Sequence, residues 1–447
     1  MPNKTYQSPS SPILVLKLTA CALLALANLT TSSATPNSEL SINAHPRFMG
    51  TGSCSSSNCH GSVNPIKGSY VLQNEYYTWQ KHDKHSKAYS DLNTPAARKM
   101  AKHLKLGDPT KEPQCLACHT TYVPEQSLRG ERYNVEDGVS CESCHGASEN
   151  WLRSHAERGA THERNISNGL NNTVSLDKRA KLCLSCHFGD ESKRVTHELY
   201  GAGHPRLRFE LDTYGILQPK HWEVDHDYIE RKGDYLPIRA WLVGQAAHAA
   251  SLTTVLADPK ASKHGIFPEL SLFDCFSCHH DLSRQQWRDR SYGGAPGAVK
   301  LNLSSLDLLI ASISKVAPEI SEELKSLTSS LAANYQRDGA ADTIKTLQAT
   351  LNSKVMPLSK QLAGDEQTCL KIISGLASVS DSSEKNVLGS IKYELAEQIG
   401  MGIQAALATS PNVAKRYSAE LNNLFKTIER PESFKPSEFD KALARFL

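Results

Sequence analysis

Residues 141–155 read CESCHGASENWLRSH, and the pattern that opens this stretch organises more than half of the chain. Two cysteines stand two residues apart, and a histidine follows the second cysteine directly. The same C-x-x-C-H order recurs at 115–119, 183–187 and 275–279. A fifth pair, CSSSNCH at 54–60, keeps the terminal Cys-His but has four residues between its cysteines. Ten of the 12 cysteines in the 447-residue chain therefore lie in five similar motifs.

C-x-x-C-H is the signature of covalent haem attachment. Two thiols must reach the two vinyl groups of one porphyrin, and the adjacent histidine then lies below the iron as its proximal ligand. A zinc ribbon also pairs cysteines, but it gives no reason for a histidine after every pair. Structural disulfides need no histidine either. The pattern predicts haem c at the four regular motifs and favours it at CSSSNCH, where a disulfide or an empty site stays open as the alternative.

The residues that the motifs predict for five haems fall into two sets. The attachment cysteines are Cys54, Cys59, Cys115, Cys118, Cys141, Cys144, Cys183, Cys186, Cys275 and Cys278. The proximal ligands are His60, His119, His145, His187 and His279. The chain has 18 histidines but 5 methionines, so histidine is expected as the sixth ligand as well. Pairs of imidazoles give lower reduction potentials than methionine–histidine pairs.

Two segments resemble the tetrahaem cytochrome c-554 family, electron carriers of ammonia-oxidising bacteria. They are CESCHGASENWLRSH and WQKHDKHSKAY at 79–89. The resemblance covers roughly residues 46–190 and implies that His155, ten residues beyond the proximal histidine, is a distal ligand. It also implies a distal ligand after Trp79. His85 is the expected residue, although its spacing from Trp79 is one residue longer than in the family, and His82 is the rival.

Three further histidines are predicted distal ligands from local pattern alone. His197 and His204 lie in THELYGAGHPRLRFEL, shortly after the fourth motif, and His248 lies in the helical run AWLVGQAAHAASLTTVL. Polar loop histidines and a satisfied core histidine are the alternatives. Cys369, which belongs to no motif, is expected to be a buried structural thiol.

The N-terminal 34 residues have the pattern of an export signal. LTACALLALA at 18–27 is a short apolar core, both charges in the segment are positive, and SSA at 32–34 fits a cleavage site. We therefore predict a signal peptide over 1–34 and a periplasmic protein. A lipidated Cys21 and an uncleaved membrane anchor are less favoured alternatives.

The rest of the chain divides into two predicted domains. A multihaem cytochrome domain over 35–295 has helices expected around 75–105, 145–157 and 236–257, with loops between them. The Gly/Pro break YGGAPGA at 292–298 marks its end. Apolar residues at helical spacing then predict an antiparallel bundle of four to six helices over 296–447, without haem. The expected fold class is mainly α with much irregular loop.

Five porphyrins attached within residues 45–290 must lie close together, which predicts serial electron transfer between redox partner proteins. A formal net charge of +3 without a long basic run gives no reason to expect nucleic acid as a partner. Two alternatives stay open. In the resembled family the haem of the second motif lacks a distal ligand, which implies an enzyme that reduces a small nitrogen oxide there. The second alternative is a structural role, in which the chain is a subunit or polymerising unit of a larger complex and the helical bundle docks a partner.

Overall fold

The computed structural model describes residues 45–68, 71–275, 278–279, 299–335, 340–380 and 393–447. The predicted signal peptide and the YGGAPGA boundary lie outside the described residues. Helices dominate what is described, and the two named strands there, β1 (Lys263–His264) and β2 (Phe267–Pro268), form one short antiparallel pair. The prediction of a mainly α fold with much irregular loop is confirmed.

The N-terminal half consists of short helices joined by loops and single 3-10 turns. Its α-helices are α1 (Glu75–His82), α2 (Ala88–Asp91), α3 (Pro95–His103), α4 (Pro113–His119), α5 (Cys141–His145), α6 (His162–Ser167), α7 (Leu176–His187), α8 (His197–Ala202), α9 (Leu211–Leu217) and α10 (His226–Lys232). Its 3-10 turns are η1 (Thr51–Ser53), η2 (Lys84–Lys87), η3 (Gln126–Leu128), η4 (Val135–Asp137) and η5 (Ser154–Ala156). The helix expected over 75–105 is thus broken into pieces, and most of 145–157 is loop.

The helix expected around 236–257 is present as α11 (Pro237–Ala257). Proline at its first position suits a helix start, because that residue has no intrahelical partner for an N–H. The helix ends where Asp258 takes an extended conformation before Pro259. The apolar residues of α11 are distributed around the whole helix, which is the pattern of a helix buried within a protein. A short helix, α12 (Pro259–Ser262), and the turn η6 (Leu270–Leu272) follow it.

The C-terminal region is a set of packed helices. They are α13 (Ser304–Ile313), α14 (Pro318–Asn334), α15 (Ala340–Thr350), the π-helical turn η9 (Leu351–Val355), α16 (Met356–Gln361), α17 (Glu366–Ala377), α19 (Tyr393–Thr409), α20 (Pro411–Thr427) and α21 (Pro436–Leu443). The turns η10 (Ser378–Ser380), η11 (Pro431–Ser433) and η12 (Ala444–Phe446) complete it. Leu306, Leu309 and Ile313 are among the apolar residues at helical spacing that predicted the bundle, and all three are fully buried in one stripe of α13.

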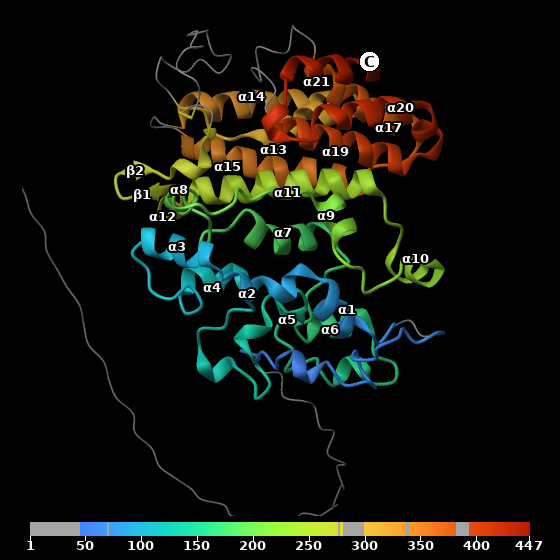
Figure 1. Cartoon of the computed structure of the whole chain (residues 1–447). Coiled ribbons are helices and arrows are strands. Elements are labelled where there is room, and N and C mark those ends of the chain that lie inside the picture. The colour runs from blue at the N-terminus through green and yellow to red at the C-terminus, as the bar shows by residue number, and fades with distance from the viewer. Residues whose placement is uncertain (1–44, 69–70, 276–277, 280–298, 336–339, 381–392) are drawn as a thin grey trace, which may run out of the picture. The chain divides into compact units, whose positions relative to one another are not determined.

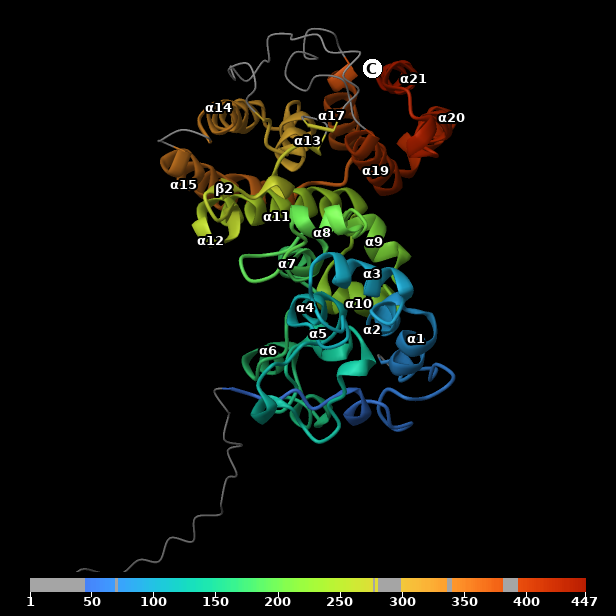
Figure 2. The ribbon, with the colours of Figure 1, turned by 60° about the vertical axis from the view of Figure 1, so that its left-hand side comes forward.

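Helix α11 packs against both sets of helices (Figures 1 and 2). On one side it contacts α7 and α9, where its Ala240 and Ala247 join a small apolar cluster with Leu184. On the other side it contacts α13, α15 and α19, and its Trp241 belongs to the large core of the C-terminal helices. One helix therefore connects the motif-bearing region to the bundle through shared apolar contacts. The division at residue 295 stays a prediction.

Cys369 is fully buried in α17 within this large core. Burial raises the pKa of its thiol to about 11, so the reactive thiolate is scarce at neutral pH. We expect iodoacetamide at about pH 8 to leave Cys369 unlabelled in the native protein and to label it after denaturation. Peptide mass spectrometry of the tryptic fragment measures this. Equal labelling rates in both states would contradict a buried thiol.

Candidate haem-binding sites

Three of the C-x-x-C-H motifs form the C-terminal end of a helix. Helices α4, α5 and α7 each end at the histidine of the second, third and fourth motif, respectively. Residues three and four positions apart lie on the same helix face. The two thiols and the imidazole of each motif therefore point to one side, as two thioethers and a proximal ligand on a single porphyrin require.

In the first and fifth motifs, too, a backbone hydrogen bond joins the histidine to the first cysteine. The amide of His279 donates to the carbonyl of Cys275 at 2.8 Å, the bond of one helical turn. The amide of His60 donates to the carbonyl of Cys54 at 3.1 Å, although two more residues lie between them. The extra residues fold back in a turn, in which a Cβ atom at Gly61 would lie 1.8 Å from the carbonyl oxygen of Ser55. The longer CSSSNCH spacing thus keeps the first cysteine and the histidine in the usual relation.

Four motif histidines each lie opposite a second histidine from elsewhere in the chain. The ring centres are 6.1 Å apart for His60 and His155, 6.2 Å for His187 and His85, 6.4 Å for His145 and His221, and 6.3 Å for His279 and His197. An imidazole nitrogen lies about 2 Å from a bound first-row metal, so two rings that share one metal have centres roughly 6 Å apart. Each pair has the separation that an iron between two imidazoles needs.

Hydrogen bonds at the Nδ1 atom fix the orientation of several of these rings. The partners are the carboxylates of Glu75 for His60 and Asp83 for His85, and the carbonyl oxygens of Ala88 for His119, Trp151 for His155 and Pro205 for His204, at 2.7–3.1 Å. A ring that donates from Nδ1 presents the lone pair of Nε2, and such partners are a regular feature of metal-bound histidines. The donor set therefore fits haem iron.

Burial keeps several of these imidazoles neutral. It lowers the pKa of His145 to about 4, with the nearby His221 adding to the effect, and it lowers the pKa of His187 to about 4. Burial also lowers the pKa of His221. A neutral ring is the form that binds a metal, because protonation removes the lone pair. The third motif and its facing histidine thus provide two unprotonated nitrogen donors at neutral pH.

Local structure explains how three predicted distal histidines reach their positions. His155 lies in η5, and the edge of its ring meets the buried Trp151 at 5.4 Å between ring centres. His85 lies in η2, which begins after Asp83. His197 is the first residue of α8, and its amide donates to a carboxylate oxygen of the buried Glu269 at 2.9 Å.

The structure places two other histidines differently from the sequence-based expectation. His248, predicted as a distal ligand, packs its ring against Phe188 at 4.6 Å between centres and is not paired with a motif histidine among the described residues. His221, which no motif or spacing singled out, lies opposite His145 instead, with its ring beside Trp222. His82, the rival of His85, is exposed at the end of α1.

At the second motif, a histidine from outside the motifs, His204, lies near His119. Burial lowers the pKa of His204, and the proximity of His119 is a smaller cause in the same direction, so the two side chains lie in the same neighbourhood. His204 follows α8 by two residues, and the same helix presents His197 to the fifth motif. One short helix with its C-terminal extension therefore supplies histidines to two motifs.

Cysteine contacts reveal which motifs are neighbours. The thiols of Cys54 and Cys141 interact, and this interaction together with burial raises the pKa of Cys141. Cys118 and Cys186 also interact, and the ammonium group of Lys193 lies 3.3 Å from the Cys186 sulfur. The first motif is thus next to the third, and the second is next to the fourth.

Two further contacts complete the series. Burial raises the pKa of Cys144 to about 12, and the nearby Cys183 and Cys186 add to this shift, which places the third motif beside the fourth. Helix α8 joins the second and fifth motifs through His204 and His197. The attachment motifs therefore follow one another in space in the order first, third, fourth, second and fifth.

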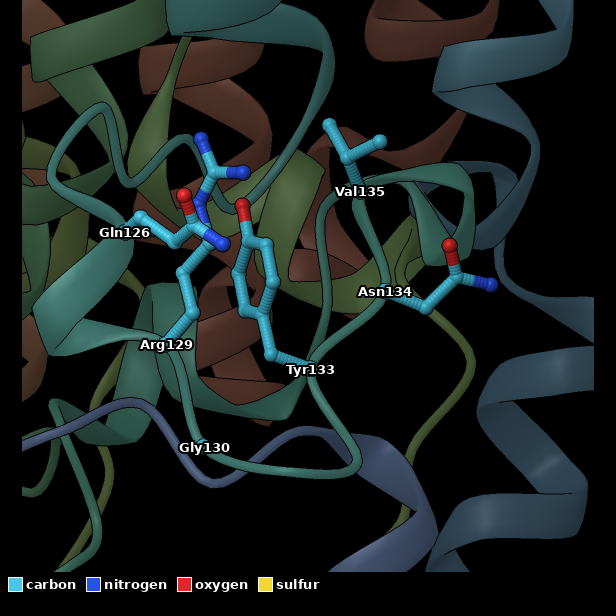
Figure 3. A pocket seen from close by; sticks show the side chains of 6 residues that line it. All are labelled: Gln126, Arg129, Gly130, Tyr133, Asn134 and Val135. Carbon is cyan, nitrogen blue, oxygen red and sulfur yellow. The ribbon is translucent and has the colours of Figure 1, made fainter.

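Other features of the described residues lie apart from these motifs. Figure 3 shows a surface pocket lined by Gln126, Arg129, Gly130, Tyr133, Asn134 and Val135, in which the Arg129 guanidinium lies over the Tyr133 ring. None of these side chains is a motif cysteine or histidine. No disulfide joins any of the eleven cysteines that the structure describes. Within the described ranges no group of three or more His, Cys, Asp or Glu side chains is arranged to hold a metal ion.

Comparison with known proteins agrees with the geometry. Residues 53–146, which carry the first three motifs, match the family model described as cytochrome c554 and c-prime. Over part of its length the chain is similar to the multihaem cytochrome c-554. Cytochrome c-554 of Nitrosomonas europaea is 29% identical over 188 residues, which are 38% of this chain and 68% of the relative. No solved structure gave a significant match.

The cytochrome c-554 match supports haem c as the cofactor and electron transfer as the role, and redox proteins are the expected class of partner. The region that the family model matches ends before the last two motifs of this chain. The helices after residue 300 lie outside it as well. No helix in the described part of the chain combines the length and apolar character needed to cross a membrane.

Proposed function

We propose that this protein is a periplasmic electron-transfer cytochrome with five covalently attached haems. The observation that carries the proposal is the set of four facing histidine pairs, each composed of one motif histidine and one distant histidine. Sequence motifs alone account for one member of each pair. The ring separation of 6.1–6.4 Å supports ligation by two histidines at these sites.

Each residue has a defined task in this proposal. Haem c, when bound, supplies an iron that accepts and returns one electron. The motif cysteines hold the porphyrin through thioethers, and the Nδ1 partners keep each axial ring in one orientation. The five motifs form one continuous series of neighbours, so the chain itself sets the distance between successive sites. Such a series supports passage of single electrons between two redox partners.

The ends of the series are more accessible than its middle. Among the motif cysteines, Cys59 of the first motif and Cys278 of the fifth are exposed, whereas the others are partly buried. The first and fifth motifs are also the terminal members of the spatial order. We therefore assign electron entry and exit to these two ends.

The second motif decides between a pure carrier and an enzyme. His204 lies in the neighbourhood of His119, which makes His204 the candidate sixth ligand that would close this site. Ligation by His204 favours the carrier over reduction of a nitrogen oxide, because a small molecule needs an open position on the metal. A high-spin signal that changes with nitric oxide would favour the enzyme.

Mass spectrometry and electron paramagnetic resonance test the proposal together. The mature holoprotein should carry five haems and begin after Ala34, and a variant with serine at both Cys54 and Cys59 should carry four. In the oxidised protein we expect two classes of low-spin signal, because the angle between axial ring planes sets the splitting of the iron d orbitals. The planes are 10° and 32° apart at the first and fifth motifs, but 87° and 76° apart at the fourth and third.

Two results would contradict the proposal. Four haems in the unaltered protein would mean that CSSSNCH is not an attachment site. Predominantly high-spin iron would mean that the facing histidines are not ligands.

A further inference from the structure

The groups behind the axial histidines differ in charge. Among the Nδ1 partners of the described histidines, two are carboxylates: Glu75 behind His60 of the first motif and Asp83 behind His85, which faces the fourth motif. His119, His155 and His204 donate to neutral backbone carbonyls instead. A negative charge therefore stands directly behind one axial ring at two of the five sites.

Both carboxylates are held in place by further donors. Glu75 accepts from the amide of Gln73 at 3.1 Å with one oxygen and from Nδ1 of His60 at 2.9 Å with the other. Its side chain is 15% exposed. Glu75 is the first residue of α1, so the start of this helix fixes the position of its carboxylate.

Asp83 is engaged still more fully. One oxygen accepts from both the amide and Nδ1 of His85, each at 2.9 Å, and the other accepts from the side-chain amide of Gln218 at 3.2 Å. The Asp83 side chain is 5% exposed. This carboxylate belongs to the N-cap of η2, so the same bonds that start the turn also orient the ring.

An anion at Nδ1 changes the donor strength of the ring. It attracts the Nδ1 proton and increases electron density at Nε2, which raises the basicity of the metal-binding nitrogen. A more basic ligand stabilises ferric iron relative to ferrous iron, and a nearby negative charge acts in the same direction because the ferric site carries one more positive charge. A neutral carbonyl produces a smaller effect of the same kind.

Resting on the five-haem function proposed above, we propose that Glu75 and Asp83 are positioning residues that lower the reduction potentials of the haems at the first and fourth motifs. In the spatial order of the motifs, the third motif lies between these two, and the second follows the fourth. The first and fourth motifs, on either side of the third, thus each have a carboxylate hydrogen-bonded to one axial ring. Local hydrogen bonding therefore separates these two sites in potential from the second motif, whose His119 and His204 donate to backbone carbonyls.

The test uses Glu75→Gln and Asp83→Asn in the full holoprotein, each followed by redox titration with optical and electron paramagnetic resonance detection. Both substitutions keep an oxygen acceptor for Nδ1 and remove the charge. We expect one haem in each variant to change its ferric-to-ferrous ratio about tenfold at fixed potential, which is an upward shift of about 59 mV for one electron. The affected signal should belong to the near-parallel class in Glu75→Gln and to the near-perpendicular class in Asp83→Asn.

Controls and outcomes keep this inference separate from the proposed function. Glu323→Gln, which removes a carboxylate paired with Lys354 in the bundle, should leave all potentials unchanged. Unmoved potentials in a variant that retains five low-spin haems would overturn the inference and leave the electron-transfer function intact. An equal shift of all five haems would also overturn it. Failure to find five haems or paired histidine ligation in the unaltered protein would instead refute the proposed function.

Discussion

Alanine in place of His221 should convert the haem of the third motif from low spin to high spin in the oxidised protein. His221 lies opposite His145 at 6.4 Å between ring centres, so its removal would take away the proposed sixth ligand. Loss of imidazole donation should also raise the potential of that haem, because the ferric form loses a stabilising ligand. Electron paramagnetic resonance of the variant measures the spin state, and redox titration measures the potential.

His248→Ala is the matched control. The His248 ring packs on Phe188 and not on a motif histidine in the described residues, so all haems should keep their spin states. His155→Ala provides a positive control at the first motif, where the rings are 6.1 Å apart. A high-spin signal in His248→Ala together with an unchanged His221→Ala spectrum would reverse the assignment. The sequence-based prediction of His248 would then be the better one.

Replacement of Trp241 by alanine should destabilise the protein by about 3–5 kcal/mol, the usual effect of deleting a buried aromatic side chain. Trp241 is fully buried on the face of α11 that packs on α19. A Cβ atom at Gly402 of α19 would lie 2.7 Å from its ring, which shows how closely the two helices approach. Alanine would leave a cavity at this contact, which links the motif-bearing region to the bundle. Urea unfolding followed by far-UV circular dichroism measures the change.

Two comparison variants make the result specific. Trp241→Phe keeps most of the apolar volume and should recover much of the stability. Ile266→Ala removes an apolar side chain that is 90% exposed, and we expect an effect within about 0.5 kcal/mol. The haem count should stay the same in all three variants, because the thioethers are covalent. A loss in Trp241→Ala no larger than that in Ile266→Ala would show that this contact does not contribute to stability.

The sequence by itself determined the parts of this protein that depend on neighbouring residues. The C-x-x-C-H motifs could be found because helical geometry places residues three and four apart on one face, and that relation needs no tertiary contact. The stripe of Leu306, Leu309 and Ile313 followed from apolar periodicity for the same reason, and helix α11 was expected from the uninterrupted helical run around His248. The prediction of His155 came from a resemblance over a short segment, and the structure places this residue opposite His60.

Only the tertiary structure decided which distant residues meet. His221 and His145 come from different helices and loops, and nothing in the sequence around KHWEV marks that histidine as a ligand. His248 lies in an apolar helix that suits a ligand and a core residue equally well, and its packing on Phe188 favours the core residue. The order of the motifs in space, first, third, fourth, second and fifth, also differs from their order in the chain. Such pairings depend on how loops and helices fold back on one another, which local spacing does not encode.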